Sequence, residues 1–261
     1  MTDSVRFDRA ADIYDRTRAI SDGAMARTIA LLASELKGRG RVLEVGIGTG
    51  LLGLPLHRAG VPVAGLDLTQ AMVAKLVEKA GGASPFPLVL GDATRMPFAD
   101  AAFGGAYLRW VLHLIPNWRS VLAETVRVLR PGGVFLVELG ACDEEGVKIQ
   151  RRFGEIAGVS IDPVGLNWAD HGPLDGEMAG HRATLRILPI DEEWEGTLGE
   201  FLDGIEEGRY SWTWTAPDDV RRRVVAELRP WAAECFGPLG EVRRLTLPRV
   251  WRAYDLPSRA D

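Results

Sequence analysis

Short runs of apolar residues alternate with segments of helical periodicity along the first half of the chain. Such alternation is typical of βαβ units, in which helices connect parallel strands. The apolar runs predict five strands, near residues 41–46, 62–67, 87–90, 103–108 and 133–139. The segments between them predict helices near residues 21–36, 50–59, 69–80 and 117–129, with Pro131 and Gly132 ending the last one.

The second half of the chain is less regular. A helical pattern near residues 144–157 is expected to cross over the sheet. Apolar and polar residues alternate around 183–189 and again near 249–255, which predicts two further strands. No linker or low-complexity segment divides the chain, so we expect residues 1–261 to form a single α/β domain.

In the stretch VLEVGIGTG, residues 42–50, the apolar run of the first predicted strand stops in a loop with glycine at every second position. Gly46, Gly48 and Gly50 can adopt the φ angles of a tight turn and carry no Cβ, so a ligand can approach the backbone closely. The loop lies between a strand and a helix N-terminus, where doubly wound sheets bind nucleotides. Glu44, just before the loop, suits a cation or a hydrogen-bond donor better than a phosphate.

Two acidic residues follow the next two predicted strands. Asp67 comes about 20 residues after the glycine loop, the spacing at which an acid meets ribose hydroxyls in nucleotide-binding folds. Asp92 stands just beyond the third strand, in GDATRMPF, where a carboxylate can accept a hydrogen bond from an adenine amine. The turn LRPGG then leads into the fifth strand.

Together, EVGIGTG, DLTQAM, GDATRMPF, LRWVLHLIPN and LRPGG resemble the ordered motifs of class I S-adenosylmethionine-dependent methyltransferases, over about residues 7–140. The resemblance is to the small-molecule branch that includes the ubiquinone and menaquinone C-methyltransferases. It implies a doubly wound, seven-stranded, mostly parallel sheet with an antiparallel last strand, and S-adenosylmethionine as cofactor. It also implies cover helices in residues 1–40, a cofactor-binding half in 41–140 and a substrate-side half with a helical lid in 141–261.

The resemblance also implies which residues bind the cofactor. Glu44 would lie near the positive methionine end, Tyr14 would close over the cofactor, and Arg18 would meet its carboxylate. The family carries a more histidine-rich segment where this chain has Arg109 and Trp110, so no base is transferred from it. The expected cofactor-binding residues are Tyr14, Arg18, Glu44, Gly46, Gly48, Gly50, Asp67, Met72, Asp92, Ala93 and Arg109.

Aromatic residues gather between the sixth and seventh predicted strands. Tyr210, Trp212 and Trp214 lie in YSWTWTAPDD, residues 210–219. They suit a lid over an apolar or aromatic substrate, because aromatic rings supply rigid apolar contact area. The same residues could instead pack a helical subdomain onto the sheet.

The methyl group of a sulfonium is already activated, so the protein needs only to position the acceptor and exclude water. An acceptor that must lose a proton would need a base, and His113 and His171 are the candidates. No spacing of Cys, His and acidic residues indicates a metal site, and none is expected.

Composition and charge argue against several other classes of protein. A net charge of −5 gives no basic surface for nucleic acid, and Arg221–Arg223 are interpreted as a solvated helix face. Two cysteines in 261 residues argue against a disulfide framework. No signal-peptide core or membrane-spanning run is apparent, so we expect a cytoplasmic protein. The oligomeric state is left open.

The sequence therefore predicts a methyltransferase acting on a small, apolar or aromatic molecule. Two alternatives remain. GIGTGLLG can be fitted to the dinucleotide fingerprint, which favours a nicotinamide-dependent oxidoreductase. A catalytically silent, adenosylmethionine-binding partner protein would carry the same glycine loop and the same Asp67.

Overall fold

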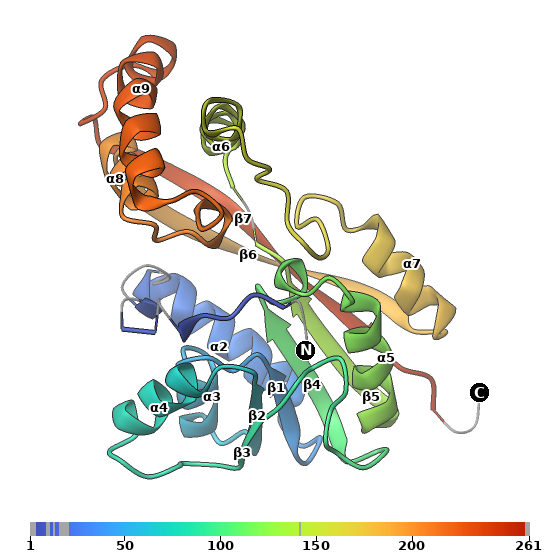
Figure 1. Cartoon of the computed structure of the whole chain (residues 1–261). Helices are drawn as coiled ribbons and strands as arrows, with labels where there is room; N and C mark the ends of the chain where they lie inside the picture. The colour runs from blue at the N-terminus through green and yellow to red at the C-terminus, as the bar shows by residue number, and fades with distance from the viewer. Residues whose placement is uncertain (1–3, 9–10, 13, 16–20, 141, 259–261) are drawn as a thin grey trace.

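The structure is a computed structural model that describes residues 4–8, 11–12, 14–15, 21–140 and 142–258. Its strands form one seven-stranded sheet in the order β3-β2-β1-β4-β5-β7-β6 (Figure 1). Strands β1 to β5 pair in parallel, whereas β7 is antiparallel to both of its neighbours, β5 and β6. The predicted fold class, a mostly parallel sheet with an antiparallel last strand, is confirmed.

The elements follow the predicted order. The strands are β1 (Val42–Val45), β2 (Val63–Asp67), β3 (Leu88–Leu90), β4 (Phe103–Arg109), β5 (Leu129–Glu138), β6 (Thr184–Gly196) and β7 (Arg243–Asp255). The helices are α2 (Asp22–Leu36), α3 (Gly53–Arg58), α4 (Gln70–Lys79), α5 (Trp118–Val128), α6 (Glu144–Ala157), α7 (Gly172–Gly180), α8 (Leu198–Glu206) and α9 (Asp218–Phe236), with 3-10 turns η2 (Leu112–Leu114) and η3 (Ser211–Thr213). Within the described ranges, no helix is both long and apolar enough to cross a membrane.

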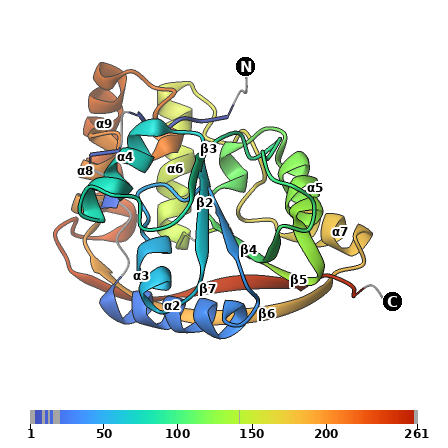
Figure 2. The ribbon, with the colours of Figure 1, turned by 90° about the horizontal axis from the view of Figure 1, so that it is seen from below.

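Helices cover both faces of the sheet (Figure 2). Successive side chains of a strand point to opposite faces, so Leu43 and Val45 of β1 join one buried cluster while Val42 joins the other. The first cluster includes residues of α5 and α7, and the second includes residues of α2, α3 and α4. All four residues of β1 are buried, as expected for a central parallel strand.

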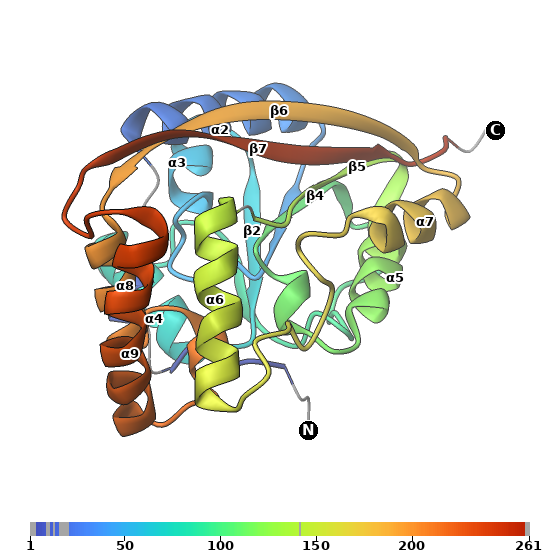
Figure 3. The ribbon, with the colours of Figure 1, turned by 90° about the horizontal axis from the view of Figure 1, so that it is seen from above.

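A third apolar cluster, the lid cluster, joins α6, α8 and α9 at one end of the long β6–β7 ribbon (Figure 3). Ile149 and Phe153 of α6 pack there with Leu202 of α8 and Val225 of α9. Helix α6 begins where Asp143 accepts a hydrogen bond from the Gly146 N–H, at 2.6 Å. A capping box in which Thr197 and Glu200 take part begins α8. The helical lid therefore has its own small core.

The structure corrects four predictions about individual elements. Helix α6 does not cross over the sheet, because its apolar face packs in the lid cluster instead. Helix α2 packs against one face of the sheet rather than over a ligand site, since Leu32 and Leu36 are fully buried in the second core cluster. Strand β5 begins at Leu129, so the predicted turn LRPGG belongs to it, with a register shift opposite Phe103 and Gly105. Strands β6 and β7 are each longer than their alternating segments.

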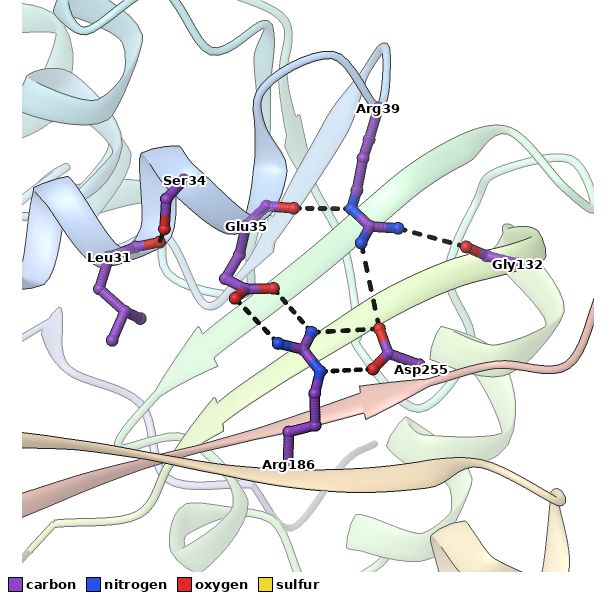
Figure 4. A network of polar contacts seen from close by, with 7 residues as sticks. All are labelled: Leu31, Ser34, Glu35, Arg39, Gly132, Arg186 and Asp255. Carbon is purple, nitrogen blue, oxygen red and sulfur yellow. Dashed lines mark hydrogen bonds and ion pairs between the residues drawn. The ribbon is translucent and has the colours of Figure 1, made fainter.

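A network of charged side chains fixes α2 to the β6–β7 ribbon (Figure 4). Arg186 of β6 donates to both carboxylate oxygens of Glu35 on α2, at 2.9 and 2.7 Å. The same guanidinium donates through Nε to Asp255 of β7, at 2.6 Å. These hydrogen bonds hold the pKa of Glu35 below its usual value. One arginine thus binds two carboxylates at once.

Candidate functional site

The glycine loop after β1 adopts the backbone that its sequence predicts. Gly46 and Gly48 have φ angles of +72° and +55°, which favour glycine. A Cβ at Gly46 would lie 2.6 Å from Val111 Cγ2, and one at Gly48 would lie 3.2 Å from Met72 Cε. Both glycines line a cavity beside the loop, here called the loop cavity.

Asp67 ends β2 directly across from this loop. Its Oδ2 accepts a hydrogen bond from the Gly48 N–H at 2.7 Å, and its Oδ1 accepts one from the Thr69 N–H at 2.8 Å. Burial raises the pKa of this carboxyl, against the lowering effect of these hydrogen bonds. Asp67 also lines the loop cavity, so this residue both fixes the loop and contributes to the cavity wall.

The loop cavity collects most of the predicted cofactor residues. Asp92 accepts hydrogen bonds from Thr94, at 2.9 Å from the backbone N–H and 2.8 Å from the hydroxyl, which sets the turn after β3. The predicted residues that line the cavity are Tyr14, Gly46, Gly48, Asp67, Met72, Asp92, Ala93 and Arg109.

Glu44 and Gly50 do not line this cavity. The Glu44 carboxylate is buried and accepts a hydrogen bond from the Tyr107 hydroxyl at 2.8 Å. Burial raises its pKa to about 8, although the Tyr107 hydrogen bond acts in the opposite direction. Gly50 faces away from the cavity, since a Cβ there would lie 2.8 Å from Leu76 Cγ on α4. The structure thus buries the Glu44 carboxylate outside the cavity wall and turns Gly50 toward α4.

The N-terminal segment lies over the loop cavity. The Val5 N–H donates to the Leu114 carbonyl at 3.0 Å, and Phe7 and Tyr14 both line the cavity. Lys75 and Lys79 of α4 form ion pairs with Asp12 and Asp15, at 2.9 and 2.6 Å. The described part of this segment therefore contributes to the wall of the loop cavity, and its closure over a bound cofactor stays a prediction. Arg18 lies outside the described residues.

Arg109 and Trp110 follow at the carboxyl end of β4. The Arg109 side chain pairs with buried Glu138 at 3.0 Å and lies 3.9 Å from the centroid of the Trp110 ring. Trp110 has a φ of +57°, a conformation that strains a non-glycine residue by about 1–3 kcal/mol. Its backbone N–H donates to the Glu138 carbonyl at 2.9 Å. Such strain is often found at functional sites.

A second and larger cavity of about 990 Å³ lies under the lid and is called the lid cavity. The two cavities share part of their walls, because residues from the N-terminal segment and from the segment after β4 line both of them. The shared residues are Ser4, Val5, Phe7, Tyr14, Trp110 and Leu114. Ligands bound in the two cavities would therefore meet near Trp110.

The lid aromatics line this second cavity and also pack structurally. Tyr210 and Trp212 stack with ring centroids 5.9 Å apart, and Trp212 meets Phe153 of the lid cluster at 5.3 Å. Trp214 donates from Nε1 to the Gly208 carbonyl at 2.7 Å and contacts Phe7 with centroids 4.9 Å apart. Both interpretations of these residues, as cavity wall and as lid core, therefore hold.

The two candidate bases differ in position. His113, in η2, lines the lid cavity. His171 stands at the N-terminus of α7 and lines neither cavity, so the prediction that it reaches the cleft is corrected. Desolvation by burial, assisted by the nearby Arg252, lowers the pKa of His171. Helix α7 packs on α5 at the face of the sheet, which carries His171 away from the lid.

Two further predictions concern single residues. Arg221 is buried and donates to the Ala216 carbonyl at 2.7 Å, so of the three consecutive arginines only Arg222 and Arg223 belong to the solvated face of α9. Cys142 and Cys235 are both free thiols, and burial raises the pKa of Cys142 to about 11. Across the described residues, no group of three or more His, Cys, Asp or Glu could hold a metal ion.

Sequence reasoning missed three contributors to the site. Phe7 bridges the cover and the lid, because its ring contacts Tyr14 at 5.7 Å and Trp214 at 4.9 Å. Glu192 and Arg249, on β6 and β7, form an ion pair in the lid cavity. In the sequence, each of these two residues is one charged residue within an alternating strand pattern. That pattern does not show which residue of the other strand is its partner.

Comparison with known proteins gives the class of this fold. Residues 43–137 match the model of a methyltransferase domain. Over 134 residues the chain is 32% identical to demethylmenaquinone methyltransferase from Mycolicibacterium paratuberculosis. The matched segment covers 50% of this chain and 56% of that protein. The chain thus spans about half the length of the curated relatives it matches.

Two solved structures share the fold over most of the chain. The YcgJ protein from Bacillus subtilis superposes with a TM-score of 0.61 at 18% identity, over 91% of this chain and all of that one (100%). A Haemonchus contortus phosphoethanolamine N-methyltransferase, in complex with S-adenosylhomocysteine, gives a TM-score of 0.57 at 17% identity, over 96% of this chain and 58% of that one.

These findings confirm the resemblance drawn from the sequence. Residues 43–137 match the model of a methyltransferase domain, and the chain shares its fold with a methyltransferase that was solved with S-adenosylhomocysteine. The matched segment begins in β1 and ends in β5, so it contains the glycine loop, Asp67 and Asp92. It does not contain the lid.

Proposed function

We propose that this protein transfers a methyl group from S-adenosylmethionine, held in the loop cavity, to a small aromatic, quinone-like acceptor held in the lid cavity. The observation that carries the proposal is the continuity of the two cavities at Trp110, which lines both. The name of the demethylmenaquinone methyltransferase relative supports a quinone-like acceptor.

The residues of the loop cavity fit this cofactor. Each Asp67 oxygen already accepts one backbone N–H, and a carboxylate oxygen has a second lone pair for a ribose hydroxyl. Asp92, at the next strand end, also lines the cavity and would accept a hydrogen bond from the adenine amine, and Met72 supplies an apolar wall. Because Gly46 and Gly48 have no side chain, they leave space for the cofactor that a Cβ at either position would reduce.

The N-terminal cover would close the other side. Tyr14 lines both cavities and would lie over the cofactor, as the resemblance implies. Arg109 is a cation that lines the loop cavity, and its bond to Glu138 fixes its position. We assign Glu44 a supporting role, because its carboxylate lies beneath the loop and binds Tyr107 rather than facing the cavity.

When bound, S-adenosylmethionine supplies an activated sulfonium methyl group, and no protein nucleophile is needed. The protein then has to hold the acceptor in line and exclude water. The aromatic wall of Tyr210, Trp212 and Trp214 suits a flat acceptor ring. His113 lines the same cavity and is our candidate base for an acceptor that must lose a proton.

The direct test is labelled methyl transfer from S-adenosylmethionine into a fractionated small-molecule extract, followed by mass identification of the product. We expect label in an aromatic product. A protein that binds the cofactor but transfers no label to any fraction would instead be a silent binding partner. A labelled product without an aromatic ring would contradict the acceptor class.

A further inference from the structure

We infer that Arg6 and Arg209 together bind an anionic group, carboxylate or phosphate, which the acceptor carries on an arm away from its reacting ring. The inference rests on the proposed function only in taking the lid cavity as the acceptor site. Both arginines line this cavity, and neither lines the loop cavity. Arg6 belongs to the N-terminal segment, and Arg209 lies between α8 and η3.

Two contacts bring these arginines to the same part of the cavity wall. The ring of Phe7, the residue after Arg6, has its centroid 4.9 Å from that of Trp214. Trp214 in turn donates from Nε1 to the carbonyl of Gly208, the residue before Arg209, at 2.7 Å. Each arginine is therefore one residue away from this chain of contacts, and two long side chains can converge there on one anion.

Arg6 can offer its donors to a ligand. It is exposed, and its side chain forms no hydrogen bond or ion pair with another residue that the structure describes. Its neighbours Val5 and Phe7 line both cavities, whereas Arg6 lines the lid cavity alone. Arg6 therefore lies on the acceptor side of the N-terminal segment rather than on the cofactor side.

Arg209 binds one carboxylate and keeps donors for a second. Its Nε and Nη2 each lie 2.7 Å from Glu207 Oε2, and within the described part of the chain no group accepts from its Nη1. The Glu207 side chain is 58% exposed, so water screens this pair and makes it weak. Arg186 shows that one guanidinium can bind two carboxylates, since it contacts Glu35 and Asp255 together (Figure 4).

The acids of the lid cavity argue against a cationic group on the acceptor. All that line the cavity have partners: Asp143 and Glu200 cap α6 and α8, Glu192 and Glu195 pair with Arg249 and Arg244, and Asp162 accepts from the Ser160 hydroxyl. An ammonium group would have to compete with these partners. An anion would instead meet the available donors of Arg6 and Arg209.

The size of the lid cavity leaves room for an arm on the acceptor. Its volume of about 990 Å³ lies at the upper end of the range of about 300–1,000 Å³ that is typical of sites for drug-sized ligands. A flat ring held against Trp110 would fill only part of this space. The remainder can hold a chain that carries the anion to the two arginines.

An anion bound by both arginines would also join the N-terminal segment to the lid. Arg6 comes from the first of these and Arg209 from the second. The bridge would close the cavity around the acceptor and exclude water from the reacting methyl group. Binding of the acceptor would thus contribute to closure of the site.

The test is calorimetric titration of the full chain with four ligands that share a naphthalene ring and a butyl arm: a carboxylate, a phosphate, an alcohol and an ammonium. We expect at least one of the two anions to bind the wild type about tenfold or more tightly than the alcohol, because it gains charged hydrogen bonds. The anion that binds more tightly identifies the source of the charge. The preference should fall at high salt, since both arginines are partly exposed.

Substitutions assign the preference to the two arginines. Arg6→Met and Arg209→Met should each lower it by about threefold or more, and the double variant should abolish it while alcohol binding changes less than about twofold. Lysine at either position should retain part of the preference, since lysine keeps the charge but loses the planar fork.

Arg222→Met is the matched control. Arg222 is an exposed arginine of lid helix α9 that lines neither cavity, so its loss should leave the preference intact. Circular dichroism should show all variants folded, because neither Arg6 nor Arg209 leaves a buried charge unpaired when it is replaced. If Arg209→Met does not fold, Arg6→Met and Arg209→Lys still test the inference.

Four outcomes would overturn the inference: equal binding of anionic and neutral ligands by the wild type, a preference for the anion that survives in the double variant, tightest binding of the ammonium ligand, or no binding of any of the four. The titrations need no cofactor. Failure of S-adenosylhomocysteine to bind in a separate titration would contradict the proposed function instead, so the two failures are distinguishable.

Discussion

The loop cavity and the lid cavity are built by different means. The loop cavity is formed by short connections after neighbouring parallel strands, and backbone groups make much of its geometry, as in the bonds from Gly48 and Thr69 to Asp67. The lid cavity depends on side chains that are distant in sequence, such as Phe7 with Trp214 and Glu192 with Arg249. A backbone-built site changes little with sequence, whereas a side-chain site can be adapted to a new acceptor.

The largest expected effect comes from a substitution within the glycine loop. Gly48→Val places a branched side chain where the ligand should lie, at a φ of +55° and 3.2 Å from Met72 Cε. We expect S-adenosylhomocysteine binding to be lost by calorimetry while circular dichroism shows a folded protein. Gly82→Val is the matched control, because Gly82 also has a positive φ but has no neighbour within 4 Å of a Cβ. A folded Gly48→Val with normal affinity would remove the loop from the cofactor site.

Asp67→Ala should have the next largest effect. Loss of two charged hydrogen bonds to ribose hydroxyls, each contributing about 1.5–3 kcal/mol, should weaken S-adenosylhomocysteine binding by roughly a hundredfold or more. Asp67→Asn keeps the shape and one oxygen acceptor, so its loss should be smaller. Calorimetry on the folded variants measures both, and equal affinity for wild type and Asp67→Ala would refute the assignment.

Glu44 tests whether the loop is supported from below. Its pKa of about 8 in the folded state lies above the ordinary value of 4.5, and burial is the main cause. Between these values the unfolded chain loses its proton while the folded chain keeps it, so stability should fall as the pH rises from about 4.5 to about 8. Water that enters the site with the charge reduces this effect, so we expect the free energy of unfolding to fall by about 2 kcal/mol over this range.

The measurement is urea unfolding of wild type and Glu44→Gln at pH 5, 6.5 and 8, chosen to span about this range. Glutamine cannot ionise, so its free energy of unfolding should lack this fall. Parallel pH profiles for the two proteins would show that Glu44 is not buried as the structure places it.

The smallest effect concerns the contact between cover and lid. Because Phe7 touches both Tyr14 and Trp214, S-adenosylhomocysteine alone should slow amide exchange in the cover and also, by about threefold to tenfold, at Trp214. Phe7→Ala should abolish the response at Trp214 and keep the one at Tyr14. If the amide exchange rate at Trp214 in the wild type does not change when the cofactor product binds, the cover and the lid are not coupled through Phe7.

The same contrast explains what could be predicted from the sequence. Strands such as β1 and β4 were predicted within a residue or two, because buried parallel strands are continuous apolar runs. Asp67 and Asp92 follow from strand ends, which the sequence also marks. These features depend on residues close together in the chain.

The lid was predicted less well for a physical reason. The apolar face of α6 indicates a buried helix, but periodicity does not say whether it packs on the sheet or on α9. The partners Glu192 and Arg249 are 57 positions apart, and the sequence does not pair them. His171 looked available because its loop is rich in glycine, yet α7 carries it to another face.

The measurement that tests the central claim most directly is a calorimetric comparison of S-adenosylhomocysteine and NADH as ligands of the full chain. The account predicts saturable binding of S-adenosylhomocysteine that is weakened in Asp67→Ala, and no comparable binding of NADH. Tighter binding of NADH than of S-adenosylhomocysteine, lost in the same variant, would contradict it and favour a nicotinamide-dependent oxidoreductase.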